Sequence, residues 1–126
     1  MARINISADC GNSPKNTLVQ QVSIALALSD AALLLDSVTD DIFWEVVGEG
    51  TINTKQGLAE ALGRVEPDQV AELTIEHVVT HGRAGAVNGS IILMDGAARA
   101  FCDVHEFSGA KGTHVKAITS YRIDLH

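Results

Sequence analysis

The sequence has few of the residues that build metal, redox and nucleic-acid sites. Its 126 residues include two cysteines, Cys10 and Cys102, which lie far apart and belong to no CxxC or Cys/His ligand pattern. Nine Lys and Arg stand against sixteen Asp and Glu, for a formal charge of −7, and no basic cluster is present that would neutralise phosphates. We therefore expect free thiols in a reducing cytoplasm, no metal and no nucleic-acid partner.

Long apolar runs are also missing. The opening MARINISADC lacks the apolar centre of a signal peptide, and residues 18–28, LVQQVSIALAL, contain two Gln and one Ser and are too short to span a bilayer. We therefore expect no membrane partner and a cytoplasmic protein. A chain of 126 residues that is 46% hydrophobic fits one domain, 1–126, that buries roughly two-thirds of its unfolded surface.

The first half of the sequence indicates helices. Ser13 can cap free backbone N–H groups ahead of Pro14, which predicts a helix from about Pro14 to about Ser29. The second half of this helix is apolar nearly all round, so we expect it to be covered on two sides. The next predicted elements are a shorter helix after Asp30, a first strand at 42–47, and a helix over 55–62 that Thr54 caps and Gly63 ends.

Strands separated by glycines fill the second half of the sequence. Their predicted ranges are 73–81, 86–93, 98–107 and 114–125. Helices first and strands afterwards indicate an α+β domain in which helices cover one face of a curved antiparallel sheet.

The dipeptide Asp-Gly in MDGA (94–97) predicts the register of two of these strands, because it is typical of a two-residue hairpin turn. Pairing Met94 with Ala97 puts large and polar side chains on one face, which we call the mixed face. The mixed face is predicted to hold Ala86, Asn88, Ser90, Ile92, Arg99, Phe101, Asp103 and His105, with Lys116, Ile118, Ser120, Arg122 and Asp124 from the last strand. The other face is uniformly apolar and is expected to be covered; it holds Val87, Ile91, Leu93, Ala98, Ala100, Cys102 and Val104.

The mixed face has two interpretations. It is solvated, as in antiparallel sheets that bury one side only, or it is covered by the N-terminal helix. Phe101 beside Asp103 favours the second interpretation, as does the need of that helix for a cover. Desolvation under the helix would raise the pKa of Asp103, which is the condition that a general acid needs.

Two long strings resemble nuclear transport factor 2-like proteins of the SnoaL-like and ketosteroid isomerase-like type. They are TDDIFWEVVGEGTINTKQGLAEAL and CDVHEFSGAKGTHVKAITSYRI, and the resemblance covers residues 14–125. It implies a single SnoaL-like domain with an ordered core over 14–125. The implied fold is α+β and cone-shaped (cystatin-like), a curved antiparallel sheet wrapped around N-terminal helices that enclose a hydrophobic pocket, and it is commonly a homodimer. The mixed face would then line the pocket, and the apolar face would serve the dimer contact.

The resemblance also implies a site. In ketosteroid isomerases an aspartic acid on the strand that matches CDVHEF stays protonated and donates a hydrogen bond to a developing oxyanion, and Asp103 falls on that position. The neighbouring pocket positions are Phe101, His105, Ile118, Ser120 and Arg122.

At several positions the sequence lacks the catalytic residues of the family, which argues against two of the family's known activities. The isomerase's proton-abstracting aspartate corresponds to Val46 and its phenol falls near Val22, so steroid isomerisation by that mechanism is not expected. The arginine that limonene epoxide hydrolases place two residues before their strand aspartate corresponds to Phe101, which speaks against that chemistry too.

We hypothesise an acid–base pair of Asp103 and His105. Residues two apart on a strand share a face at roughly 6.6 Å separation, and a neutral imidazole suits a base near pH 7. Asn88 would orient the carboxyl group from the neighbouring strand, and Arg122 would hold an anionic or enolate oxygen. The alternative is a structural ion pair between Asp103 and Arg122, with His105 at the mouth of the pocket.

Trp44 and His77 are further candidates for the pocket wall. His77 shares one side of its predicted strand with Leu73 and Val79. Its spacing of four from His81 resembles a metal-ligand pair on a helix, but on a strand the two stand about 13 Å apart, too far for one zinc ion.

Two classes of function fit the sequence. One is a cofactor-independent acid–base enzyme of the isomerase, lyase, cyclase, dehydratase or hydrolase type that acts on an apolar carbonyl- or hydroxyl-bearing compound. The other is a non-catalytic ligand-binding or dimeric interaction module, because a pocket does not prove turnover. A catalytic Asp103 should have a displaced pKa and room beside it, whereas a structural one should already be paired.

Overall fold

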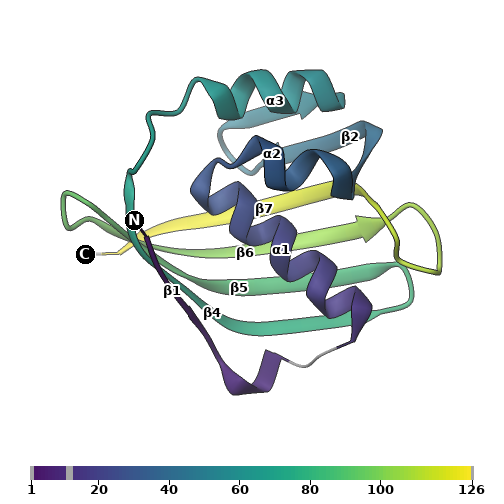
Figure 1. The fold of residues 1–126 in the computed structure, drawn as a ribbon, viewed down its shortest axis with the longest axis horizontal. Helices are drawn as coiled ribbons and strands as arrows, with labels where there is room; N and C mark the ends of the chain where they lie inside the picture. The colour runs from purple at the N-terminus through teal and green to yellow at the C-terminus, as the bar shows by residue number, and fades with distance from the viewer. Residues whose placement is uncertain (1, 11–12, 126) are drawn as a thin grey trace.

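A seven-stranded curved sheet carries three helices on one face (Figure 1). The computed structural model describes residues 2–10 and 13–125. The strands are β1 (Arg3–Ile6), β2 (Val38–Val46), β3 (Gly50–Asn53), β4 (Val70–His81), β5 (Ala84–Leu93), β6 (Ala98–Phe107) and β7 (Val115–Leu125). The helices are α1 (Pro14–Leu28), α2 (Ala31–Leu34) and α3 (Lys55–Gly63), with 3-10 turns at Ala8–Cys10 and Leu35–Ser37. The expected α+β class is confirmed.

The N-terminal helix begins and ends where its sequence signals predict. The Ser13 hydroxyl accepts a hydrogen bond from the backbone N–H of Asn16 at 3.1 Å, and Ser29 ends α1 in the left-handed conformation, with φ 55°. The helix packs against β4 and β5 and lies across the inner face of the sheet (Figure 1). On β6 and β7 the centre of the mixed face is buried, at Phe101, Asp103, His105, Ile118 and Ser120, whereas Asp124 at the end of β7 is exposed.

Helix α3 and strand β2 differ slightly from their predicted bounds. Thr54 caps α3 by accepting from the N–H of Gly57 at 3.1 Å, but Gly63 is the last residue of the helix and Arg64 forms the C-cap. Strand β2 starts at Val38, four residues before the predicted start at 42, because it pairs in parallel with β7. Strands β4 to β7 form the predicted antiparallel meander, whereas the whole sheet is mixed.

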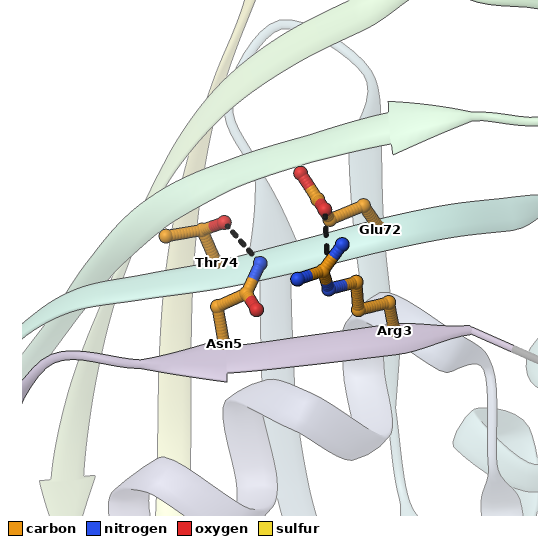
Figure 2. Close-up of polar contacts among 4 residues, drawn as sticks. All are labelled: Arg3, Asn5, Glu72 and Thr74. Atoms are coloured by element: carbon orange, nitrogen blue, oxygen red, sulfur yellow. Dashed lines mark hydrogen bonds and ion pairs between the residues drawn. The ribbon is translucent and has the colours of Figure 1, made fainter.

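Two short strands were not predicted. Strand β1 pairs in parallel with β4 at one sheet edge, and Figure 2 shows Arg3 near Glu72 (3.9 Å) and Asn5 bonded to Thr74 (3.4 Å). The sheet thus begins before residue 14, where we expected the ordered core to start. Strand β3 forms a hairpin with β2 at the opposite edge. Each of these strands has only four residues, too few for an alternating pattern to stand out.

The register of the β5–β6 hairpin is one residue away from the predicted one. Leu93 accepts from the N–H of Gly96 at 2.9 Å and donates to the carbonyl of Ala97 at 2.8 Å, and Gly96 has φ 90°. The loop is therefore the three-residue type with a left-handed glycine, rather than the two-residue type. Since a slip of one residue exchanges the faces of a strand, Val87 and Ile91 point inward and Asn88 points outward.

A β-bulge in β4 also changes the face of the sheet to which the following side chains point. The pairing with β5 shifts between Ile75, which lies opposite Gly89, and His77, which lies opposite Asn88. Ile75 is buried whereas His77 is exposed, so His77 and Leu73 do not share a face as predicted. Bulges bend a strand and increase its twist, and β4 is visibly curved (Figure 1).

The apolar core fills the space between the helices and the inner face of the sheet. Its most buried members include Val19 and Val22 of α1, Leu58 of α3, and Ile118 of β7. Among the described residues, no helix is both long and apolar enough to cross a membrane.

Candidate active site

Asp103 lies at the centre of the inner face, on β6 and beneath α1. Its side chain is 4% exposed, and its Oδ1 accepts a hydrogen bond of 2.6 Å from the hydroxyl of Ser120 on β7. The two residues lie directly opposite each other in the β6–β7 ladder. A carboxyl group so buried is rare unless it is paired or functional.

A second hydrogen bond fixes the Ser120 hydroxyl. The indole Nε1–H of Trp44 on β2 donates to Ser120 Oγ at 2.9 Å. An indole can only donate, so the hydroxyl accepts from Trp44 and is left to donate its own proton to Asp103. The direction of both bonds is thereby set, and they run from Trp44 through Ser120 to the carboxyl group.

His105 forms the other side of the network. Its ring is fully buried, at 0% exposure, and its Nε2 lies 2.9 Å from the hydroxyl of Ser23 on α1. Its Nδ1 has no hydrogen-bond partner among the described residues. An orphaned buried N–H is rarer than an under-satisfied acceptor, so we infer that the proton is on Nε2 and is donated to Ser23. The Ser23 hydroxyl in turn interacts with the carboxyl group of Asp103 and acts to lower its pKa.

Burial shifts the pKa values of both titratable groups toward their neutral forms. Desolvation raises the pKa of Asp103, and the hydroxyls of Ser120 and Ser23 and the charge of Arg122 only partly oppose it. Desolvation also lowers the pKa of His105 to about 3. Burial therefore disfavours the charged form of both groups.

Two adjoining cavities lie over this network. The inner cavity, of about 10 Å³, touches Asp103 and Ser23 and is enclosed by Leu26, Phe101 and Arg122. That volume is close to the space that a single water molecule needs. The outer cavity, of about 340 Å³, lies between α1, α3 and the sheet, and both cavities share Leu26, Ala27, Ile91 and Arg122 in their walls.

Arg122 stands between the two cavities. Its guanidinium lies 5.5 Å from the centre of the Trp44 ring, in cation–π geometry. Over the described part of the chain, Arg122 makes no ion pair within 4 Å, and so does not pair directly with Asp103. The structural ion pair that we considered as an alternative is thus not formed.

Solved structures of low sequence identity share this architecture. An NTF-2 like protein of unknown function from Burkholderia xenovorans superposes with a TM-score of 0.74 at 18% identity, over 89% of this chain and 84% of its own. A putative ketosteroid isomerase from Kribbella flavida gives 0.72 at 15% identity, over 89% and 79%. A putative SnoaL-like polyketide cyclase from Shewanella denitrificans gives 0.70 at 15% identity, over 88% and 92%.

This chain has the nuclear transport factor 2-like fold. The fold implied by the sequence strings is therefore confirmed. No protein-family model matches the sequence, and neither does any curated protein. At identities below 25% the likeness concerns the fold, so the chemistry rests on the side chains of this chain.

The nuclear transport factor 2-like sheet brings most of the predicted site residues together. Trp44, Phe101, Asp103, His105, Ile118, Ser120 and Arg122 all lie on the inner face. His105, however, lies beneath Ser23 and lines neither cavity. It is not at the pocket mouth, and it reaches Asp103 only through the serine.

Two predicted site residues lie on the opposite face. His77 and Asn88 line a hollow on the outside of the sheet, where His77 Nδ1 and Asn88 Oδ1 are 2.9 Å apart. The predicted place of Asn88 beside Asp103 is therefore wrong, because of the three-residue hairpin loop. The predicted place of His77 in the inner pocket is wrong because of the β4 bulge.

Ser23 and Arg99 are site residues that sequence reasoning missed. Ser23 is fully buried in α1, and a polar residue in the apolar run VSIALAL was a signal that could have revealed it. Arg99 lines the outer cavity. Its position on the mixed face was predicted, but its role was not considered. The described residues contain no group of three His, Cys, Asp or Glu placed to hold a metal ion.

Proposed function

We propose that this protein binds a small apolar carbonyl- or hydroxyl-bearing compound in the two cavities and acts on it as a cofactor-independent acid–base enzyme. The observation that carries the proposal is a desolvated carboxyl group, Asp103, held beside a space of about 10 Å³. The named activities of two structural neighbours, a putative ketosteroid isomerase and a putative SnoaL-like polyketide cyclase, favour the same class of isomerase, cyclase, dehydratase or hydrolase chemistry.

Asp103 acts as the acid in this proposal. A substrate oxygen enters the inner cavity, and the Asp103 carboxyl group donates a hydrogen bond or a proton to it as negative charge develops. The proton that leaves the carbon next to the carbonyl passes to solvent or a buffer base that enters through the outer cavity, because no second carboxyl group or imidazole lines the two cavities in the described chain. Ser120 and Ser23 hold the carboxyl group in position. Arg122 borders the same cavity and stabilises the anion electrostatically.

His105 is a positioning residue in this scheme and not the base that we first hypothesised. A pKa of about 3 makes it a weak base, and Ser23 stands between its ring and Asp103. Its part is to orient the Ser23 hydroxyl. Val22 and Val46 occupy the positions that correspond to the steroid isomerase's phenol and base, so we do not propose the steroid isomerase mechanism.

Proton exchange next to a carbonyl group tests the proposal without knowledge of the natural substrate. The wild-type protein is expected to accelerate deuterium incorporation into an apolar cyclic ketone such as 2-decalone, measured by ¹H NMR in D₂O. Asp103→Asn keeps the shape but loses the proton, and is expected to reduce the protein-dependent rate by about 10²- to 10⁴-fold. Asp41→Asn, at an exposed position on β2, is the matched control and should leave the rate unchanged.

Two results would reject the enzyme. If Asp103→Asn exchanges the ketone as fast as the wild type, Asp103 is not the acid. If the wild type binds the ketone, seen as a change in Trp44 fluorescence, but does not accelerate exchange, the protein is a non-catalytic binding module. One observation favours that alternative: among the described residues that line the two cavities, Asp103 is the single carboxyl group and there is no histidine.

We further propose a homodimer that forms through the outer face of the sheet, in the cytoplasm, where its thiols Cys10 and Cys102 would stay reduced. Val79, Tyr121 and Ile123 expose 60%, 48% and 65% of their surface on this face. They surround the outer hollow, of about 370 Å³, which also includes Cys102. Contiguous exposed apolar side chains of this kind are typical of interaction surfaces.

Sedimentation velocity tests the dimer. The wild type is expected to sediment as a dimer at micromolar concentration, and Ile123→Arg as a monomer because it would bury an unpaired charge at the contact. Leu33→Arg replaces an equally apolar exposed residue on α2 and should remain dimeric. A monomeric wild type, or a dimer that survives Ile123→Arg, would contradict the proposal.

A further inference from the structure

The outer cavity has an unusual charge for this protein. The chain carries sixteen acidic and nine basic residues, yet the two charged residues in the described wall of this cavity are both arginines, Arg99 and Arg122. A cavity lined by cations within an acidic protein attracts anions and is poorly suited to cationic ligands.

The two arginines are placed to act together. In the β6–β7 ladder Arg122 pairs with Phe101 and Arg99 pairs with Asp124, so the arginines are diagonal neighbours on the inner face. Side chains in that relation have Cα atoms roughly 7–8 Å apart and are within reach of one ligand group when they are long. Two guanidinium groups can therefore meet a single carboxylate.

Neither guanidinium group forms a strong ion pair within the described chain. Arg122 stacks on Trp44, and no carboxylate in the described chain lies within 4 Å of it. Arg99 pairs with Asp124 at 3.4 Å, but the Asp124 side chain is 80% exposed. Exposed pairs of this kind are weak, so a carboxylate inside the cavity can take Arg99 from Asp124.

The rest of the cavity wall is mainly apolar. It includes Leu26, Leu62, Val70 and Leu93, with Ser29 and Gln69 as its uncharged polar members. A volume of about 340 Å³ is at the lower end of the range of small-molecule sites, about 300–1,000 Å³. The wall thus fits an apolar chain or ring system with one anionic group.

We infer that the outer cavity selects apolar carboxylates, and that Arg99 and Arg122 together bind the ligand's carboxylate group. This rests on the function proposed above and names its substrate class, an apolar carboxylic acid that also bears the carbonyl or hydroxyl group. The carboxylate lies between the arginines while the reacting oxygen points through the shared wall toward Asp103. Arg99 and Arg122 are then specificity residues, distinct from the acid.

A comparison of octanoate with 1-octanol tests the inference. The two probes share an eight-carbon chain, and octanoate is anionic at pH 7. Binding is measured by isothermal titration calorimetry and by the fluorescence of Trp44, the sole tryptophan of the chain, which lines the cavity. Octanoate is expected to bind the wild type about tenfold or more tightly than octanol, since charge-assisted hydrogen bonds are stronger than neutral ones.

Substitutions of the two arginines test whether they cause the preference for octanoate over octanol. Arg99→Gln and Arg122→Gln should each weaken octanoate binding about tenfold and leave octanol binding unchanged. Arg83→Gln, in the exposed β4–β5 turn, is the control and should bind like the wild type. Equal affinity for the two probes, an undiminished octanoate affinity in both arginine variants, or no binding of octanoate would each overturn the inference.

The test separates this inference from the proposed catalysis. Asp103→Asn should keep the preference for octanoate, because the acid does not touch the outer cavity. If octanoate binds as expected while the ketone probe is not exchanged, the carboxylate site stands and the enzyme does not. If exchange depends on Asp103 but the arginine variants bind octanoate normally, the enzyme stands and this inference fails.

Discussion

Replacing Gly89 with alanine is expected to destabilise the protein by at least about 3 kcal/mol. A Cβ atom at this position would overlap the carbonyl oxygen of Thr74 and lie 2.9 Å from its carbonyl carbon. Both neighbours are backbone atoms of β4 at the bulge, so no side chain can move aside. The free energy of unfolding, measured by urea denaturation, checks the result.

Gly109→Ala is the matched control for Gly89→Ala. A Cβ at Gly109 would meet no atom within 4 Å, and its φ is not positive. The substitution is therefore expected to change the free energy of unfolding by less than about 1 kcal/mol, with a small gain from the less flexible unfolded chain. Equal stabilities of Gly89→Ala and Gly109→Ala would show that β4 and β5 do not approach each other as described. They would also contradict the curvature of the sheet around the site.

Stability is expected to fall in acid because of His105. Its pKa is lowered from 6.5 to about 3 in the folded protein, so between these values the unfolded chain binds a proton that the folded chain excludes. The stabilisation is complete above pH 6.5 and is lost as the pH falls toward 3, at about 1.4 kcal/mol per pH unit. Asp103 acts in the opposite sense, because its raised pKa makes the folded protein bind a proton more readily than the unfolded chain.

His105→Gln isolates the histidine contribution. Glutamine can still donate to Ser23 but does not titrate, and all other groups are common to both proteins. The difference in unfolding free energy between wild type and variant is expected to change by about 2–3 kcal/mol between pH 6 and pH 4, with the wild type losing more. Parallel stability curves over this range would contradict a buried neutral His105 and the hydrogen-bond direction inferred from it.

Local signals predicted the helices and the inner faces of β6 and β7. The caps at Ser13 and Thr54 depend only on neighbouring residues, and both form as expected. The alternation around Phe101 and Asp103 also survives in the structure, since both are buried on one face. These features follow from neighbouring residues and from the alternation of side chains along a strand, so they can be predicted without knowledge of distant contacts.

The errors came from single inserted residues and from contacts across the fold. The loop after Leu93 takes one residue more than its Asp-Gly dipeptide suggests, which exchanged the faces of β5 and misplaced Asn88. The bulge between Ile75 and His77 leaves no clear mark in the sequence of β4, because its cause lies in the approach of β5. Ser23 belongs to the site only because α1 crosses β6.

The claim that Asp103 is a desolvated acid can be tested directly by an NMR titration of its carboxyl carbon in the ¹³C-labelled protein, with Asp103→Asn used to assign the signal. A pKa well above the ordinary value of about 3.9 is expected, because burial outweighs the hydrogen bonds from the serines and the charge of Arg122. A pKa at or below the ordinary value would mean a solvated or ion-paired carboxylate, and would remove the acid from the proposed mechanism.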